Sequence, residues 1–364
     1  MRLFAIKKYR KDKLILITLL IFTLLFILSL GLFELYSSGG IEFFKKQLNN
    51  ILIGLIISFF ILIINSKIIF EFAYIFYISG LILLLCVEIF GHTSMGATRW
   101  LKFASFRFQP SEIVKFTTIL GLASVLSNSS KLDTLRSIIL PFFIIFFPSL
   151  LIVKQPDLGT GLILLFTCVI MLFCANISWR LIFGSIFSLI CISPFIWLNM
   201  YEYQKKRVLI FFLNDDKLNS GYNVHQSQIA IASGGKFGTG FKLGSQTQFG
   251  FLPENHTDFI FSAFAEEFGL FLSSVIIIAY GIVIYILWHM SFSVKDRIHQ
   301  ITIAGCASLF FFHVFINIGM VMSILPVVGI PLPFFSYGGA VTINTMIMIA
   351  FCINLYLSDN NKTN

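Results

Sequence analysis

Residues 14 to 34 read LILITLLIFTLLFILSLGLFE, and this apolar run indicates how the whole chain folds. A membrane core about 30 Å thick is crossed by roughly 20 helical residues. Further apolar runs of similar character occupy residues 48–65, 69–90, 111–127, 137–153, 159–176, 178–199, 259–289, 298–323 and 338–357. In lipid, every backbone polar group must be hydrogen-bonded within the protein, which leaves helices or closed barrels. Long, unbroken apolar runs fit helices rather than barrel strands, which have about ten residues of alternating hydrophobicity. The sequence therefore predicts an all-α, polytopic integral membrane protein with about ten transmembrane helices.

The composition agrees with this class. Of the 364 residues, 57% are hydrophobic and only 12% are charged, and the mean hydropathy is +0.90. This leaves too little polar surface to cover a soluble globule. We expect a single membrane domain over residues 1–364, with one long loop at residues 200–258 between the seventh and eighth spans.

The orientation follows from the basic residues before the first span. The first thirteen residues contain Arg2, Lys7, Lys8, Arg10, Lys11 and Lys13. Positive charge flanking a first span keeps that end in the cytoplasm. Ten spans then return the C-terminus to the cytoplasm and leave the 200–258 loop on the extracytoplasmic side.

Charge and motif patterns exclude several function classes. The net charge of +9 is spread over many loops, so it favours anionic membrane lipids and pyrophosphate over nucleic acid. The six cysteines all lie in apolar runs, so no disulfide framework is indicated. Residues 235–240 have the glycine spacing of a P-loop, but Phe241 stands where lysine is required, which rejects a nucleotide site. This segment is either a flexible loop that approaches a ligand closely or a plain glycine-rich reversal.

Three ionisable residues gather where the long loop meets the eighth span. Residues 253–261 read PENHTDFIF and contain Glu254, His256 and Asp258 within five positions. This boundary between water and lipid is where a lipid-linked substrate presents its head group, so we interpret the stretch as the active centre. Asp258 also has a plain alternative, as the N-cap of the following helix. A metal site is disfavoured, because a third firm ligand is lacking.

Other polar residues lie at the ends of spans or within them. Glu112 and Lys115 are three apart on one helix face, which favours a paired structural brace over a polar cavity. Glu266 lies eight residues beyond Asp258, about 12 Å deeper, and is expected to be a structural residue that does not face lipid unpaired. Lys154 and Asp157 flank a short turn, where they neutralise each other or Lys154 faces a pyrophosphate.

Six motifs together resemble those of the SEDS family (shape, elongation, division and sporulation). In chain order they are Gly96 to Leu101, Gln109 to Glu112 with Lys115, Gln155 to Thr160, Gln226 to Gly235, Leu252 to Phe261 and Leu332 to Gly339. They cover the chain from about residue 90 to 340. Residues 106–110, 154–157 and 325–331 resemble the rod-shape-determining RodA type of this family rather than the division type.

This resemblance implies a peptidoglycan glycosyltransferase in the bacterial cytoplasmic (inner) membrane. Such an enzyme polymerises lipid II into glycan strands at the outer face, for cell elongation and rod shape, and releases undecaprenyl pyrophosphate. Asp258 is then the general base. The residues expected to bind substrate are Arg99, Lys154, Gln155, Asp157, Gln226, Ser227, Glu254, His256 and Ser336.

The resemblance also implies partners and leaves an alternative open. The expected partner is a class B penicillin-binding transpeptidase within the elongation machinery. The basic cluster at residues 205–207, or a divalent cation such as Mg²⁺, is a candidate to offset pyrophosphate charge. The alternative function is a transporter that flips the same lipid-linked precursor, which many spans and intramembrane Glu and Lys residues would also suit.

Overall fold

The computed structural model describes residues 2–94, 97–103, 106–128, 133–199, 205 and 221–359. The chain divides into two compact units, each built from segments far apart in sequence. Unit 1 consists of Met1–Ser66, Gln226–Ile303 and Pro331–Asn364, and unit 2 of Lys67–His225 and Ala304–Ile330. Whether the two units form one membrane domain over residues 1–364 depends on how they are joined. The single domain therefore stays a prediction.

Unit 1 is built from long helices and two shorter ones near the active-centre stretch. Its helices are α1 (Arg2–Ser38), α2 (Gly40–Ile63), α10 (Tyr222–Gly234), α11 (Ser245–Gln248), α12 (Ile260–Ser293) and α14 (Gly339–Ser358), and α13 (Arg297–Val321) begins in it. Helix α1 packs along α12, and α2 packs along α14. Gly54 of α2 lies against Met346 of α14, because a glycine lets neighbouring helices approach closely.

Unit 2 contains five long helices and a small sheet. Its helices are α4 (Ala73–Phe90), α5 (Pro110–Asn128), α6 (Leu135–Lys154), α7 (Leu158–Cys174) and α8 (Trp179–Asn199), preceded by the short α3 (Ser66–Glu71). The antiparallel strands β1 (His92–Ser94), β2 (Ala97–Phe103) and β3 (Phe106–Phe108) lie in the order β1-β2-β3. The aromatic residues of this segment suit short strands, which the pattern of apolar runs did not predict.

The predicted membrane class is confirmed. Each of the ten apolar runs coincides with a helix of the described chain. Seven helices are long and apolar enough to cross a membrane, and α7 is a shorter apolar helix. Large apolar side chains such as Phe22, Ile56 and Phe90 are more than half exposed, as a lipid-facing surface requires. The count of ten spans stays a prediction.

Helix α12 is interrupted at Gly269, where φ is 74° and ψ is −176°. Residues 235–240, here called the glycine loop, fill the interruption and take over its backbone hydrogen bonding. The bonds run from Leu270 N to Gly235 O (2.9 Å), from Phe271 N to Lys236 O (3.2 Å), from Thr239 N to Glu266 O (3.0 Å) and from Gly240 N to Glu267 O (3.0 Å). The glycine loop therefore approaches a helix backbone. This corresponds to the expected reversal rather than to a flexible ligand loop.

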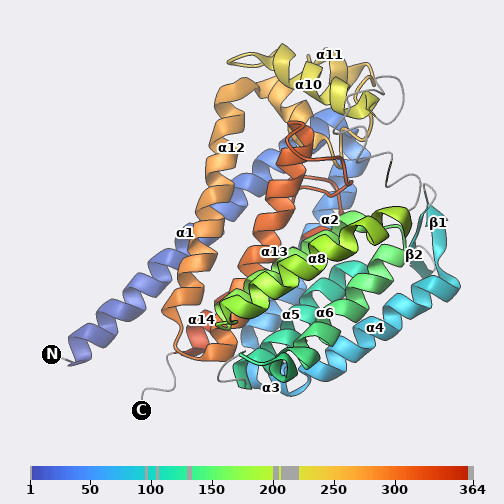
Figure 1. The fold of residues 1–364 in the computed structure, drawn as a ribbon. Helices are drawn as coiled ribbons and strands as arrows, with labels where there is room; N and C mark the ends of the chain where they lie inside the picture. Colours follow the sequence, from blue (N-terminus) through green and yellow to red (C-terminus); the bar gives the residue numbers. More distant parts are fainter. Residues whose placement is uncertain are drawn as a thin grey trace. The chain divides into compact units, whose positions relative to one another are not determined.

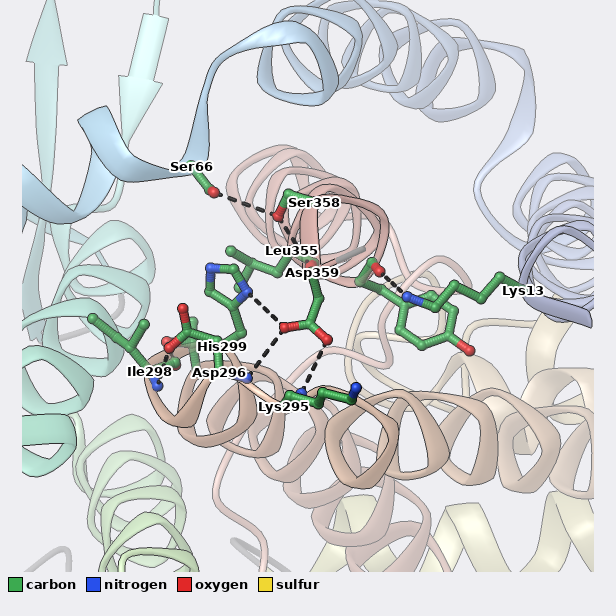
Figure 2. A network of polar contacts seen from close by, with 11 residues as sticks. Lys13, Ser66, Lys295, Asp296, Ile298, His299, Leu355, Ser358 and Asp359 are labelled. Carbon is green, nitrogen blue, oxygen red and sulfur yellow. Dashed lines mark hydrogen bonds and ion pairs between the residues drawn. The ribbon is translucent and has the colours of Figure 1, made fainter. Parts of the chain in front are cut away.

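The start of α1 and the end of α14 lie at one end of unit 1, while α10 and α11 lie at the other (Figure 1). Asp359 ties the first of these ends together (Figure 2): its carboxylate accepts hydrogen bonds from the backbone of Lys295 (3.0 Å) and Asp296 (3.1 Å). Lys13 donates to the carbonyl of Tyr356 (2.6 Å). The start of α1, the end of α14 and the α12–α13 turn thus share one end of unit 1 (Figure 1), and its cytoplasmic location stays a prediction.

Candidate active site

A tight turn places Asp258 directly before α12. Glu254 has a positive φ of 51°, and its carbonyl accepts hydrogen bonds from the backbone of Thr257 (3.1 Å) and Phe259 (3.2 Å). Its carboxylate accepts a further bond from the Thr257 hydroxyl (2.7 Å). Glu254, predicted to bind substrate, therefore closes the turn that presents Asp258.

Asp258 lies at the mouth of the helix, one residue before its N-cap position. The helix begins at Ile260, and its N-cap residue is Phe259, with no side-chain cap bond. The alternative that Asp258 is the N-cap is therefore wrong. The side chain is half-buried, between the solvent-facing turn and the buried first residues of α12.

His256 is held between aromatic rings in the same turn. Its ring centroid lies 4.2 Å from that of Phe43 of α2, and its Nδ1 is 3.2 Å from Oδ1 of Asn255. Burial lowers the pKa of His256 below its ordinary value, and the nearby Glu254 charge opposes that shift. A neutral imidazole is consequently favoured near pH 7.

The segment 331–338 braces this turn from a second side. Ser336 donates its hydroxyl to the carbonyl of Thr257 (2.6 Å) and accepts from the backbone of Leu332 (2.8 Å). The Tyr337 amide donates to the carbonyl of His256 (2.9 Å). Ser336, predicted to bind substrate, is thus brought to the turn as a brace.

Gln47 of α2 is a site residue that the sequence interpretation missed. Its amide donates to the Thr342 hydroxyl (2.8 Å) and to the carbonyl of Ser336 (3.3 Å), and its carbonyl accepts from Gly338 N (3.3 Å). The side chain is buried. A polar amide just before an apolar run was the available signal, because a buried amide needs partners.

The other predicted residues of unit 1 lie on α10 and α12. Ser227 of α10 bonds to Ser262 of α12 (2.7 Å between hydroxyl oxygens). Its neighbour Gln226 has a buried side-chain carbonyl oxygen with no hydrogen-bond partner among the described residues. Glu266 is fully buried and, as expected for a structural residue, accepts hydrogen bonds from residues 245–247. The structure brings Ser227 against α12, the helix that also carries Glu266.

A second predicted group gathers in unit 2 around the turn at residues 155–157. The Arg99 guanidinium donates to the carbonyls of Gln155 (3.3 Å) and Pro156 and lies 3.8 Å from the Asp157 carboxylate. Asp157 also caps α7 by accepting from Thr160 N (3.3 Å). Arg99, Gln155 and Asp157 are therefore brought together, chiefly by bonds to one another.

Lys154 does not join that network. Its ammonium lies 3.8 Å from the carboxylate of Glu88, and both side chains are about half exposed. Among the basic cluster, Lys205 donates to the carbonyl of Leu198 (3.3 Å). Residues 206 and 207 lie outside the described residues, as does Gly96 of the first motif.

The predicted pair of Glu112 and Lys115 forms inside α5. Lys115 Nζ lies 2.8 Å from Glu112 Oε1, and both side chains are almost fully buried. His313 of α13 joins the pair, with its Nε2 2.8 Å from the same ammonium. Each charge is stabilised by its partner, as a brace requires.

With this geometry in view, comparison with known proteins shows the family. Residues 10–361 match the FtsW/RodA/SpoVE family of cell cycle proteins. The chain belongs to this family. It is 36% identical over 362 residues to the peptidoglycan glycosyltransferase MrdB of Escherichia coli strain K12, covering 98% of this chain and 97% of that protein.

Solved structures of family members share the fold. One chain, from work described as "Structural coordination of polymerization and crosslinking by a peptidoglycan synthase complex", gives a TM-score of 0.84 at 27% identity, covering 95% of this chain and 98% of that one. The rod shape determining protein RodA of Thermus thermophilus gives 0.71 at 25% identity, covering 93% and 96%. The resemblance of this FtsW/RodA/SpoVE-family chain to the RodA type is thereby confirmed.

Proposed function

We propose that this chain is a peptidoglycan glycosyltransferase that polymerises lipid II for cell elongation and rod shape, with Asp258 as its general base. The observation that carries the assignment is the position of Asp258. It is a half-buried carboxylate on a braced turn, two residues before the first residue of α12. A rigid turn suits a base, because proton transfer needs a group held within hydrogen-bonding reach of the reacting hydroxyl.

The proposed reaction needs one carboxylate and one good leaving group. Asp258 takes the proton from the 4-hydroxyl of the acceptor sugar while that oxygen attacks the anomeric carbon of the donor. A glycosidic bond forms, and the bond between the anomeric carbon and the pyrophosphate oxygen breaks. The electron pair leaves with undecaprenyl pyrophosphate, which requires no protein acid.

Charge on the departing pyrophosphate must be offset. Lys154 suits this role, because its pair with Glu88 is long and solvent-screened and so is readily exchanged for a phosphate. Arg99 is already bonded to the 155–157 turn, which suits it to position that turn. Among the described residues, no group of three or more His, Cys, Asp or Glu side chains is arranged to hold a metal ion. We therefore assign no step to a protein-held Mg²⁺.

We further propose that the reaction occurs at the outer face of the bacterial inner membrane, beside a class B penicillin-binding transpeptidase. The basic residues before α1 support a cytoplasmic N-terminus. In unit 1, the Asp258 turn lies at the end of α1 that carries Ser37, because Ser37 bonds to Glu267 of α12 (2.6 Å). The similar solved chain comes from a peptidoglycan synthase complex that couples polymerisation to crosslinking, which supports such a partner.

The transporter alternative gains one observation. A helix broken within the membrane is a feature that transporters use to bind substrates, and α12 is broken at Gly269. Here, however, the glycine loop occupies the exposed backbone groups, so they are not available to a lipid-linked precursor. Polymerase activity is the function that the Asp258 turn supports best.

The test is Asp258→Asn in purified protein supplied with labelled lipid II, with glycan strands resolved on a gel. Loss of a positioned base should slow polymerisation by about 10² to 10⁴-fold, while lipid II binding and thermal stability stay near those of the parent. Glu42→Gln, which neutralises an exposed carboxylate of α2 that pairs with Lys46 on the same helix, is the control and should keep the parental rate. If Asp258→Asn polymerises within a few fold of the parent, the base assignment is wrong.

A further inference from the structure

The buried carboxylate of Glu266 accepts four hydrogen bonds. It is 0% exposed, within the first turns of α12. All the donors to its carboxylate come from one short segment of the chain. They are Gln246 N (2.8 Å), Thr247 N (3.0 Å), the Thr247 hydroxyl (2.7 Å) and the Ser245 hydroxyl (3.4 Å). One carboxylate therefore fixes residues 245–247 at the start of α11.

The same segment holds the turn that leads to Asp258. The backbone amide of Leu252 donates to the carbonyl of Gln246 (3.0 Å), and the side-chain amide of Asn255 donates to the carbonyl of Thr247 (3.2 Å). Asn255 in turn contacts His256 through its side-chain oxygen (3.2 Å). A continuous set of hydrogen bonds thus runs from Glu266, through residues 246–247, to the turn before Asp258.

The backbone leaves little freedom in this arrangement. A Cβ on Gly244 would lie 2.7 Å from the Glu266 carboxylate, so the chain can pass this close only as glycine. The carbonyl of Glu266 is also engaged, because it accepts bonds from the amide and the hydroxyl of Thr239 (both 3.0 Å). The side chain and the backbone of Glu266 are therefore fixed by the segment that precedes Asp258.

Glu266 is stabilised without a cation. Within the described part of the chain, no Lys or Arg side chain forms an ion pair with Glu266. Its charge depends instead on the N–H and O–H donors of residues 245–247, which are charge-assisted bonds. A glutamine here would turn an NH₂ group toward those donors, so the segment would lose its anchor even though the side-chain shape is kept.

We propose that Glu266 is a positioning residue for glycosyl transfer, which holds the loop before Asp258 in the geometry that the reaction needs. This inference rests on the proposed role of Asp258. Misplacing a catalytic group by about 1 Å costs up to about 10² in rate. The Glu266 carboxylate is bonded to residues 245–247 and not to the turn itself, so its effect passes through Thr247 and Asn255.

The test compares Glu266→Gln, Thr247→Val and Thr247→Ser in purified, folded protein by kcat and KM for labelled lipid II. We expect kcat to fall about 10²-fold in Glu266→Gln and about tenfold in Thr247→Val, with KM within about threefold of the parent. Thr247→Ser keeps the hydroxyl and should restore kcat to within about twofold. Thr247→Val deletes one bond of four, so it remains informative if Glu266→Gln does not fold.

The matched control is Thr345→Val, which removes a buried hydroxyl that bonds only within its own helix (2.7 Å to Val341 O). It should leave kcat unchanged. If Thr247→Val lowers thermal stability as Thr345→Val does but keeps the parental kcat, Glu266 is merely structural and the proposal fails.

Asp258→Asn separates the two ideas. Full activity in that variant would refute the base, whereas its inactivity together with normal kcat in both Glu266→Gln and Thr247→Val would refute only the positioning role.

Discussion

Glu112 in unit 2 and Glu266 in unit 1 are both buried glutamates near the start of a long helix, but they are stabilised by different groups. Glu112 has a lysine on its own helix at 2.8 Å. Glu266 has hydrogen-bond donors from a loop, and Glu267 beside it accepts from the Ser37 hydroxyl (2.6 Å) and from the Gln248 amide (3.1 Å). Glu34 of α1 completes this acidic cluster of Glu34, Glu266 and Glu267. Its carboxylate oxygens are buried and have no hydrogen-bond partner among the described residues.

The difference separates stability from positioning. An ion pair within one helix is made as soon as that helix forms, so it braces unit 2 without depending on a loop. A carboxylate whose donors come from a loop transmits any change to that loop. A buried carboxylate that is stabilised by loop donors instead of a cation is therefore useful where a loop must be fixed beside a reacting group.

The largest effect is expected on breaking the brace of unit 2. Lys115→Met leaves the buried Glu112 charge without its cation and should destabilise the protein by about 3 to 5 kcal/mol. The double variant Glu112→Leu/Lys115→Met strands no charge and should be milder than either single change. Unfolding in detergent measures both. Lys154→Met is the control, because its half-exposed pair with Glu88 contributes at most about 1 kcal/mol. Additive losses in the double variant would count against the brace.

A smaller effect of opposite sign is expected in the acidic cluster. Glu34→Leu removes a buried carboxyl that has no hydrogen-bond partner in the described part of the chain, so unfolding should become harder by about 1 to 3 kcal/mol. Ser37→Ala, one turn further along α1, removes a satisfied hydroxyl and should lower stability instead. A marked loss of stability in Glu34→Leu would mean that Glu34 contributes a favourable interaction, and the contrast between the two buried glutamates would disappear.

The smallest effect concerns the turn that the acidic cluster supports. Because burial lowers the pKa of His256, the unfolded chain binds its proton more readily than the folded chain. The associated stability is complete above about pH 6.5 and is lost as the pH falls through the folded pKa. As the pH is lowered from about 7.5 to about 5, the melting temperature should therefore fall less in His256→Gln than in the parent. The difference should appear below about pH 6.5, the ordinary pKa of histidine. An identical fall in both proteins would reject this role, and His225→Gln, at an exposed position, is the control.

The sequence predicted most of the fold, because length and apolarity alone determine where a chain can cross lipid. It also located the pair of Glu112 and Lys115, since residues three apart on a helix must meet. The small sheet at residues 92–108 was missed, because the flanking spans dominated the pattern. Residues 222–234 were expected to be a loop and form α10 instead, since helix formation there depends on packing such as the Ser227 contact with Ser262.

The site was predicted in part. The PENHTDFIF stretch identified the turn, but not how the turn is held, because Ser336, which bonds to the turn, and Gln47, which bonds to Ser336, come from distant parts of the chain. The cap interpretation of Asp258 failed because Phe259, not Asp258, occupies the N-cap position. The break at Gly269 was also invisible, since one glycine in an apolar run is common in membrane helices.

That break constrains how the protein is made. The amides of Leu270 and Phe271 find their partners in the glycine loop, which leaves the ribosome before α12 does. Entering lipid with those amides unmet would cost several kcal/mol for each group. The first turns of α12 therefore complete their insertion only when the earlier loop has reached the same depth and docked. Synthesis of this helix is thus a two-step event, in which the earlier segment must be in place before the helix that follows it is complete.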